Sequence, residues 1–151
     1  MAPVRNRVAV MHGVNLDMLG SRDPEHYGTL TLAELQSEIG AWARDLSLET
    51  IFFNSNHEGD FVEFCHRLPE TADAAILNPG AWTHYSWAIH DAVQVSGVPV
   101  VEVHLSDVDS REQWRRTSVL EDIRVGRVAG KGADGYRDAL EMLAGHLEGG
   151  G

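Results

Sequence analysis

The sequence predicts a doubly wound α/β fold in which a five-stranded parallel sheet carries helices on both faces. Two observations lead to this prediction. Short apolar, β-branched runs alternate with longer segments of helical periodicity, and several of the short runs are apolar throughout. A strand without polar alternation is typical of a parallel sheet that is covered on both sides. The length of 151 residues suits a single domain over residues 1–151.

Five segments are expected to form the strands. Each is short, rich in Val, Ile, Ala or Phe, and bounded by polar or turn-forming residues. They cover residues 7–11, 49–53, 74–78, 98–105 and 126–129. Because helical segments separate most of them, the strands are predicted to lie parallel in a flavodoxin-like sheet with the order 2-1-3-4-5.

The helices are predicted from apolar residues that recur every three or four positions. The apolar stripes are Leu32, Leu35, Ile39, Trp42 and Leu46; Phe61, Phe64, Cys65 and Leu68; Tyr85, Ile89, Ala92 and Val93; and Tyr136, Leu140, Leu143 and Leu147. The first of these helices has a further start signal, because Thr31 and Glu34 have the spacing of a capping box.

The composition narrows the expected partners and location. The formal net charge is −11 at pH 7, whereas binding to nucleic acid or to an anionic membrane calls for a basic face. No stretch reaches the roughly 20 apolar residues that a membrane span needs. The single cysteine, Cys65, cannot form an internal disulfide, so we expect a buried thiol in a reducing, cytoplasmic location. The glycine-rich end at 149–151 is expected to fray.

Polar residues gather in the segments that follow the predicted strands. These segments are HGVNLDMLGSRDPEHYGTLT after the first strand, SNHEGD after the second, NPGAWTHYS after the third and EVHLSDVDSREQWRR around the end of the fourth. In an open parallel sheet the ligand binds beyond the carboxyl ends of the strands. We therefore expect the functional residues at one rim of the sheet.

Three kinds of site fit the string Asn56-His57-Glu58: a metal site, an acid–base site and a helix N-terminus. Histidines are numerous, but none has the spacing of a metal signature, and HEGDF lacks the second histidine of H-E-x-x-H. The sequence also contains no phosphate-binding glycine motif and no nucleophile elbow. Acid–base chemistry without a metal is favoured, with these three residues supporting the rim and the helix N-terminus.

The connection after the first strand is suited to acid–base chemistry. Residues 16–30 make it long for a strand–helix connection, and a long loop of this kind often acts as a lid. It carries Arg22 and Tyr27 between two glycines. Tyr27 is either part of an acid–base site on the lid or a packing residue at the surface.

The end of the fourth strand supplies a second acid–base pair. In VEVHLS the period of two places Glu102 and His104 on the same face, so that the carboxylate can orient the imidazole and hold its proton. Arginines follow at 111, 115 and 116. They indicate either an anionic substrate or a solvated helix face.

These motifs, taken in order, resemble the type II 3-dehydroquinate dehydratases. The blocks that carry the resemblance are HGVNLDMLGSRDPEHYG, SNHEGDFVEF, ILNPGAWTHYSWAIHDA, VVEVHLSDVDSREQWRRTS and VAGKGADGY. Because they cover nearly the whole chain in one order, the resemblance is specific. It implies a hydro-lyase that removes water from 3-dehydroquinate through an enolate to give 3-dehydroshikimate, with no metal, nucleotide or other cofactor.

The resemblance also implies roles for individual residues. The catalytic set is Tyr27 as the base, Arg22 and Arg111 beside it, Asn15 holding a water against the enolate, and His104 as the general acid oriented by Glu102. The substrate-binding set is Asn78, His84, Asp91, Arg115 and the backbone at Leu105 and Ser106. The chain departs from the family pattern at His12 and Val14, where Asn and Pro are usual, at Tyr85 and Trp87, which replace smaller residues, and at His90, where Arg is common.

The resemblance further implies a homododecamer, built as a tetramer of trimers, in which Asp91 reaches into a neighbouring site. The sequence agrees with this, because Asp91 lies beside an apolar stripe with no obvious partner in its own chain. Two alternatives stay open. One is a catalytically impaired family member that acts as a binding protein, and the other is a hydro-lyase for a related cyclic hydroxy acid. The resemblance does not distinguish aromatic biosynthesis from quinate breakdown.

Overall fold

The structure of the protein is a computed structural model that describes residues 4–149. Of the end expected to fray, residues 150–151 lie outside the described residues, and Gly149 follows the last helix directly. None of the helices within residues 4–149 is long and apolar enough to span a bilayer.

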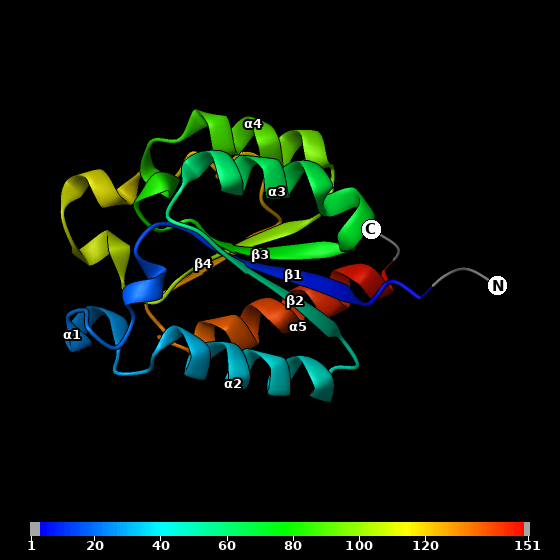
Figure 1. The fold of residues 1–151 in the computed structure, drawn as a ribbon, viewed down its shortest axis with the longest axis horizontal. Coiled ribbons are helices and arrows are strands. Elements are labelled where there is room, and N and C mark those ends of the chain that lie inside the picture. Colours follow the sequence, from blue (N-terminus) through cyan, green and yellow to red (C-terminus); the bar gives the residue numbers. More distant parts are fainter. Residues whose placement is uncertain (1–3, 150–151) are drawn as a thin grey trace.

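One parallel sheet forms the centre of the structure (Figure 1). Its strands are β1 (Arg7–His12), β2 (Glu49–Asn54), β3 (Ala74–Asn78), β4 (Val100–His104) and β5 (Gly126–Ala129). They lie in the order β2-β1-β3-β4-β5, and every neighbouring pair is parallel. The predicted fold class and strand order are confirmed. Every residue of β3 and β4 is buried, including Glu102 and His104, as expected for central strands of a parallel sheet that is covered on both faces.

Helices cover both faces of the sheet (Figure 1). The helices are α2 (Leu32–Asp45) and α5 (Asp134–Glu148) on one face, and α3 (Glu58–Thr71) and α4 (Trp87–Ser96) on the other. Each pair packs its apolar stripe against the sheet, so the core consists of two layers, one on each face. The capping box of Thr31 and Glu34 is present as predicted.

The prediction that Tyr85 belongs to a buried helical stripe is wrong. Tyr85 is 60% exposed. The helix begins only at Trp87, because the hydroxyl of Ser86 accepts a hydrogen bond from the backbone N–H of Ile89 and caps the first turn. Tyr85 therefore precedes α4 and does not share the face of Ile89.

Short helical segments gather at the carboxyl ends of the strands. They are η1 (Leu16–Met18) and α1 (Pro24–Tyr27) after β1, η2 (Gly80–His84) after β3, and η3 (Val108–Ser110) and η4 (Gln113–Arg116) after β4. Figure 1 shows α1 and the yellow segment that contains η4 at the same end of the sheet. The connection expected to be a lid over residues 16–30 thus has helical structure of its own.

The loops after β1 and β3 lie backbone against backbone. A Cβ added at Gly13 would come within 2.4 Å of the carbonyl oxygen of Pro79. A Cβ added at Gly80, which has a φ of +65°, would come within 2.6 Å of the carbonyl oxygen of Val14. Only glycine permits both approaches. This contact joins two of the loops that form the pocket described next.

Candidate active site

A pocket of about 110 Å³ opens at the carboxyl ends of the strands. All of the predicted site residues except Glu102 and Asp91 line it. They are Asn15, Arg22, Tyr27, Asn78, His84, His104, Leu105, Ser106, Arg111 and Arg115. Asn78 and His104 are the last residues of β3 and β4, and the others come from the segments after β1, β3 and β4, which the sequence places at the same rim. Arg116 does not line the pocket, and its Nε donates to the carbonyl oxygen of Asp109.

Two arginines surround the side chain of Tyr27. The short helix α1 presents this tyrosine: it begins at Pro24, its N-cap Asp23 accepts a hydrogen bond from the backbone N–H of Glu25, and it ends at Gly28. The Nη1 of Arg111 donates to the phenol oxygen at 2.7 Å. The guanidinium carbon of Arg22 lies 3.7 Å from the ring centroid. Tyr27 therefore has one guanidinium at its phenol oxygen and another over its ring.

His104 and Glu102 form a buried pair on β4. The Nε2 of His104 lies 2.6 Å from the Oε2 of Glu102, and the two side chains are 6% and 0% exposed. Because the carboxylate can only accept, Nε2 carries a proton and Nδ1 is the ring nitrogen left for a substrate. The predicted pairing across one face of the strand is confirmed.

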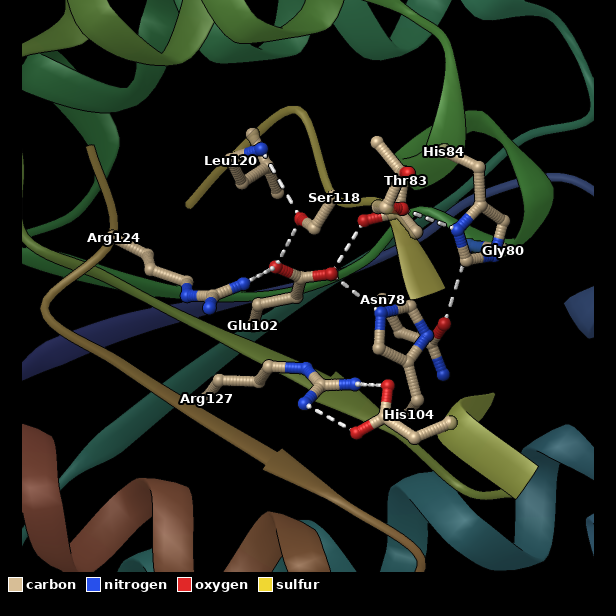
Figure 2. A network of polar contacts seen from close by, with 12 residues as sticks. Asn78, Gly80, Thr83, His84, Glu102, His104, Ser118, Leu120, Arg124 and Arg127 are labelled. Carbon is tan, nitrogen blue, oxygen red and sulfur yellow. Dashed lines mark hydrogen bonds and ion pairs between the residues drawn. The ribbon is translucent and has the colours of Figure 1, made fainter. Parts of the chain in front are cut away.

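Glu102 accepts more hydrogen bonds than the sequence predicts (Figure 2). Besides His104, the hydroxyls of Thr83 and Ser118 donate to it at 2.5 and 2.7 Å, and the Nη1 of Arg124 donates at 2.7 Å. Burial by itself would raise the pKa of Glu102. The hydrogen bond and charge of His104, with the two hydroxyls, outweigh burial and lower that pKa from its ordinary 4.5 to about 2. Glu102 is therefore an anion throughout the neutral range.

His84 faces the pocket as a hydrogen-bond acceptor. Its Nδ1 lies 2.7 Å from the carbonyl oxygen of Thr117, and a carbonyl can only accept, so the proton sits on Nδ1 and Nε2 is free to accept. Burial lowers the pKa of His84, with the nearby positive charges of His104 and Arg115 acting in the same direction. The ring is therefore neutral. Beside it, Arg115 pairs with Glu112 and lies over the ring of Trp114.

Asn78 belongs to a buried chain of three hydrogen-bonded side chains. Its Nδ2 donates to the hydroxyl of Tyr136 at 2.9 Å, and that hydroxyl lies 2.9 Å from the Nε2 of His12. Burial lowers the pKa of His12 to about 4 and raises the pKa of Tyr136, so both are neutral, and the hydroxyl of Tyr136 donates to His12. The Oδ1 of Asn78 accepts from the backbone N–H of Gly80. These bonds fix the amide so that its remaining N–H is the group available to a ligand.

In the string Asn56-His57-Glu58, Asn56 supports the rim of the pocket. Its Oδ1 accepts from the backbone N–H of Asn15 at 2.8 Å, and its Nδ2 donates to Asp17. It thereby holds Asn15, whose backbone is in the left-handed region with a φ of 68°. His57 is the N-cap of α3 and does not line the pocket, and Glu58 lies in the first turn of that helix.

Asp91 has a partner within its own chain, which corrects the prediction that it has none. Its Oδ1 lies 2.8 Å from the Nδ1 of His90, and the Nε2 of His90 lies 3.0 Å from Asp122. The side chain of Asp91 is nevertheless 75% exposed, and it does not line this chain's pocket. Its assignment to a substrate-binding set stays a prediction that requires a neighbouring subunit.

Within residues 4–149, no three or more His, Cys, Asp and Glu side chains lie close enough together to hold a metal ion. Cys65 is fully buried, as predicted, and burial raises the pKa of its thiol to about 12. Such a thiol is inert as a nucleophile at neutral pH.

Sequence reasoning missed several residues that support the site. Thr83 and Ser118 lie within two of the motif blocks, so their positions in those blocks are the signal that could have identified them. Tyr136 was predicted only as part of an apolar stripe. Arg124 lies between the recognisable motifs, in LEDIRVG, and carries no sequence signal of its role.

Comparisons with known proteins agree with this geometry. The family model described as dehydroquinase class II matches residues 6–144. The 3-dehydroquinate dehydratase of Syntrophotalea carbinolica is 45% identical over 135 residues, which are 89% of this chain and 91% of that protein. The enzyme of the same name from Halothermothrix orenii is 46% identical over 91% of this chain and 93% of that protein. The crystal structure of type II dehydroquinase from Butyrivibrio crossotus superposes with a TM-score of 0.88 and 36% identity, covering 92% of this chain and 97% of that one. With the pocket, its acid–base groups and these similarities in agreement, the chain belongs to the class II dehydroquinase family.

Proposed function

We propose that this chain is a 3-dehydroquinate dehydratase, a hydro-lyase that converts 3-dehydroquinate to 3-dehydroshikimate by a stepwise elimination through an enolate. The observation that carries the proposal is the placement of two opposite functions in one pocket. Tyr27 with its two arginines can accept a proton, and His104 with Glu102 can donate one. Membership of the class II dehydroquinase family supports the same reaction.

The first step removes a proton from the carbon next to the substrate ketone. The phenolate oxygen of Tyr27 accepts this proton, and the electron pair of the broken C–H bond moves onto the carbonyl oxygen to form the enolate. Arg111 and Arg22 stabilise the phenolate before the transfer. A water molecule held by Asn15 donates a hydrogen bond to the enolate oxygen, which is an oxyanion-type stabilisation.

The second step expels the β-hydroxyl group as water. The enolate re-forms the ketone, its electron pair forms the new carbon–carbon double bond, and the C–O bond to the hydroxyl breaks. Hydroxide is a poor leaving group, so His104 gives it a proton from Nδ1, and Glu102 stabilises and orients the imidazolium ring. Proton exchange with solvent restores both groups for the next turnover.

The remaining pocket residues bind the substrate. The backbone N–H groups of Leu105 and Ser106 and the amide of Asn78 hold the carboxylate. The Nε2 of His84 accepts from a ring hydroxyl, and Arg115 donates to another. The pocket therefore offers hydrogen-bond donors to an anion and both donors and acceptors to hydroxyl groups.

Incubation of the purified protein with 3-dehydroquinate tests the function. We expect the conjugated enone absorbance of 3-dehydroshikimate to rise in the presence of EDTA as well as in its absence, because the proposed chemistry uses no metal. Binding of 3-dehydroquinate without turnover would identify an impaired family member that serves as a binding protein. Turnover only of a related cyclic hydroxy acid would identify the other hydro-lyase.

We also propose a cytoplasmic homododecamer, a tetramer of trimers in which Asp91 contributes to a neighbouring site. The exposed carboxylate of Asp91 supports this arrangement, as do the exposed aromatic residues Tyr85, just before α4, and Trp87, at its start, which are 60% and 62% exposed. Exposed aromatic groups of this size are enriched in interfaces between subunits. The single buried Cys65 suits a reducing compartment.

Two inactive variants are expected to complement each other. Tyr27→Phe removes a subunit's own base, whereas Asp91→Ala impairs the site of its neighbour, so a mixed trimer contains some sites with both residues intact. The two variants are unfolded and refolded together, and the activity is compared with that of each refolded alone. Activity above the sum of the separate samples supports a shared site. If native mass spectrometry confirms mixing and no activity returns, Asp91 acts within its own subunit or outside catalysis.

A further inference from the structure

The buried pair of Glu102 and His104 is anchored by a cation from outside the pocket. Arg124 lies in the turn before β5 and reaches the far oxygen of the Glu102 carboxylate, with its Nη1 2.7 Å from Oε1 (Figure 2). The opposite oxygen, Oε2, faces His104. Glu102 thus lies between the guanidinium of Arg124 and the imidazole of His104, and Arg124 does not line the pocket itself.

The backbone around Arg124 holds its side chain in place. Its own N–H donates to the carbonyl oxygen of Leu120 at 3.0 Å, and the N–H of Val125 donates to the carbonyl oxygen of Val100 at 2.8 Å. The turn is therefore fastened to the beginning of β4, the strand that carries Glu102 and His104. The side chain of Arg124 is only 17% exposed, so its ion pair with Glu102 is screened weakly by solvent.

We propose that Arg124 is a positioning residue for the dehydration: it fixes the carboxylate of Glu102 and takes up part of its negative charge, so that His104 holds its proton less tightly and gives it up more readily. This inference rests on the proposed function for its effect on turnover. A carboxylate without a second cation would stabilise the imidazolium more strongly. Such an imidazolium would be a weaker acid toward the departing hydroxyl.

The other charged and titratable groups near His104 come from several elements. His84 on η2 stacks on it with ring centroids 6.2 Å apart. Arg111 and Arg115 come from the segment after β4 and line the same pocket. These groups take part in substrate binding or catalysis. Arg124 does not line the pocket, so a substitution at this position removes no contact to the substrate.

Arg127 provides the matched control. It lies on β5 opposite Glu102 in the sheet register, but its guanidinium pairs with Asp109 at 3.3 and 3.4 Å (Figure 2). Its side chain is 26% exposed, similar to that of Arg124. Arg127→Met therefore removes a nearby cation without removing a contact to Glu102.

The test compares the pH dependence of kcat in Arg124→Met, Arg124→Gln, Arg124→Lys and Arg127→Met. In Arg124→Met we expect kcat at neutral pH to fall about tenfold with KM within a factor of two, and the alkaline limb of the profile to move up by about one pH unit. Arg124→Gln should show the same upward movement because it also lacks the charge. Arg124→Lys should keep the wild-type limb, and Arg127→Met should keep both kcat and the limb.

A purely structural role for Arg124 would lower thermal stability without moving the limb. An unmoved limb in both Arg124→Met and Arg124→Gln overturns the proposal, and so does an equal movement in Arg127→Met. Should Arg124→Met fail to fold, the comparison of Gln with Lys decides, because the two differ in charge at that position.

A second measurement separates this proposal from the proposed function. In protein labelled with 13C at histidine Cε1, the His104 signal is identified by its loss in His104→Gln, and its midpoint is followed against pH. The midpoint should be higher in Arg124→Gln than in wild type and unchanged in Arg127→Met, whether or not the protein turns over 3-dehydroquinate. If the enzyme is active and the midpoint does not change, the role of Arg124 is refuted and the proposed function stands. If the protein is inactive and the midpoint shifts, the proposed function is refuted and the role of Arg124 stands.

Discussion

Tyr27→Phe is expected to lower kcat by about 10³-fold or more, while KM and the affinity for a substrate analogue change by only a fewfold. The phenol oxygen is the only atom lost, and it is the atom to which Arg111 donates at 2.7 Å. The ring, over which Arg22 lies, remains in the variant, so the shape of the pocket is kept. Steady-state kinetics with 3-dehydroquinate and calorimetric titration with the analogue measure the two effects separately.

Tyr85→Phe is the matched control for this variant. It removes the same atom from a tyrosine that is 60% exposed and does not line the pocket, so we expect kcat to stay within twofold of wild type. A Tyr27→Phe enzyme that retains kcat within tenfold of wild type would exclude Tyr27 as the base. In Tyr27→Phe, exchange of the substrate α-proton with deuterated solvent should also be abolished, because this exchange requires the base and not the general acid.

Glu102→Gln is expected to lower the free energy of unfolding at pH 7 by about 3–5 kcal/mol. The substitution leaves Arg124 and His104 without the buried carboxylate that both contact. The amide must also place an N–H where Glu102 accepts four hydrogen bonds, so at least one donor loses its partner. Urea titration at fixed protein concentration measures this loss. We expect kcat to fall by about 10²-fold as well, since the amide cannot stabilise an imidazolium.

The pH dependence of the free energy of unfolding shows whether the loss of stability in Glu102→Gln comes from the ionised carboxylate. Its pKa in the folded protein is about 2 against an ordinary 4.5, so the folded state binds this proton more weakly than the unfolded state does. The stabilisation is complete above about pH 4.5 and is lost as the pH falls toward 2, with a total on the order of 3 kcal/mol. The difference in free energy of unfolding between wild type and Glu102→Gln should therefore decrease as the pH falls from about 4.5 toward 2.

Glu141→Gln is the control for this effect. Glu141 forms an exposed ion pair with Arg137, in which the side chains are 57% and 60% exposed, and pairs of this kind contribute at most about 1 kcal/mol. If the difference in free energy of unfolding between wild type and Glu102→Gln stays constant from pH 7 to pH 3, the ionised Glu102 is not the source of the pH-dependent stabilisation.

The fold follows from local features of the sequence. The apolar runs of β3 and β4 and the capping box at Thr31 were sufficient to place the sheet and α2, because burial on both faces and a side-chain cap are encoded within a few residues. The misplacement of Tyr85 has the same local origin. Apolar spacing alone cannot tell where a helix begins, and at this point the hydroxyl of Ser86 decides it.

The site was predictable where the geometry of a single element determines it. The period of two in β4 necessarily brings Glu102 and His104 to one face, and the parallel sheet brings the loop residues to one rim. Arg124 was not predictable, because its contact with Glu102 depends on how the turn before β5 packs against β4. The pairing of His90 with Asp91 was not predictable either, since adjacent residues on a helix do not normally face each other.

The contact between the loops at Gly13 and Gly80 limits how this enzyme can be redesigned. Each loop supplies a pocket residue, Asn15 from one and His84 from the other, and neither backbone can be moved without displacing its counterpart. A graft that imports only one loop from a homologue would bring a foreign backbone against a surface shaped for the original. Substrate range in this scaffold therefore has to be altered by exchanging the two loops together, as a single transplantable unit.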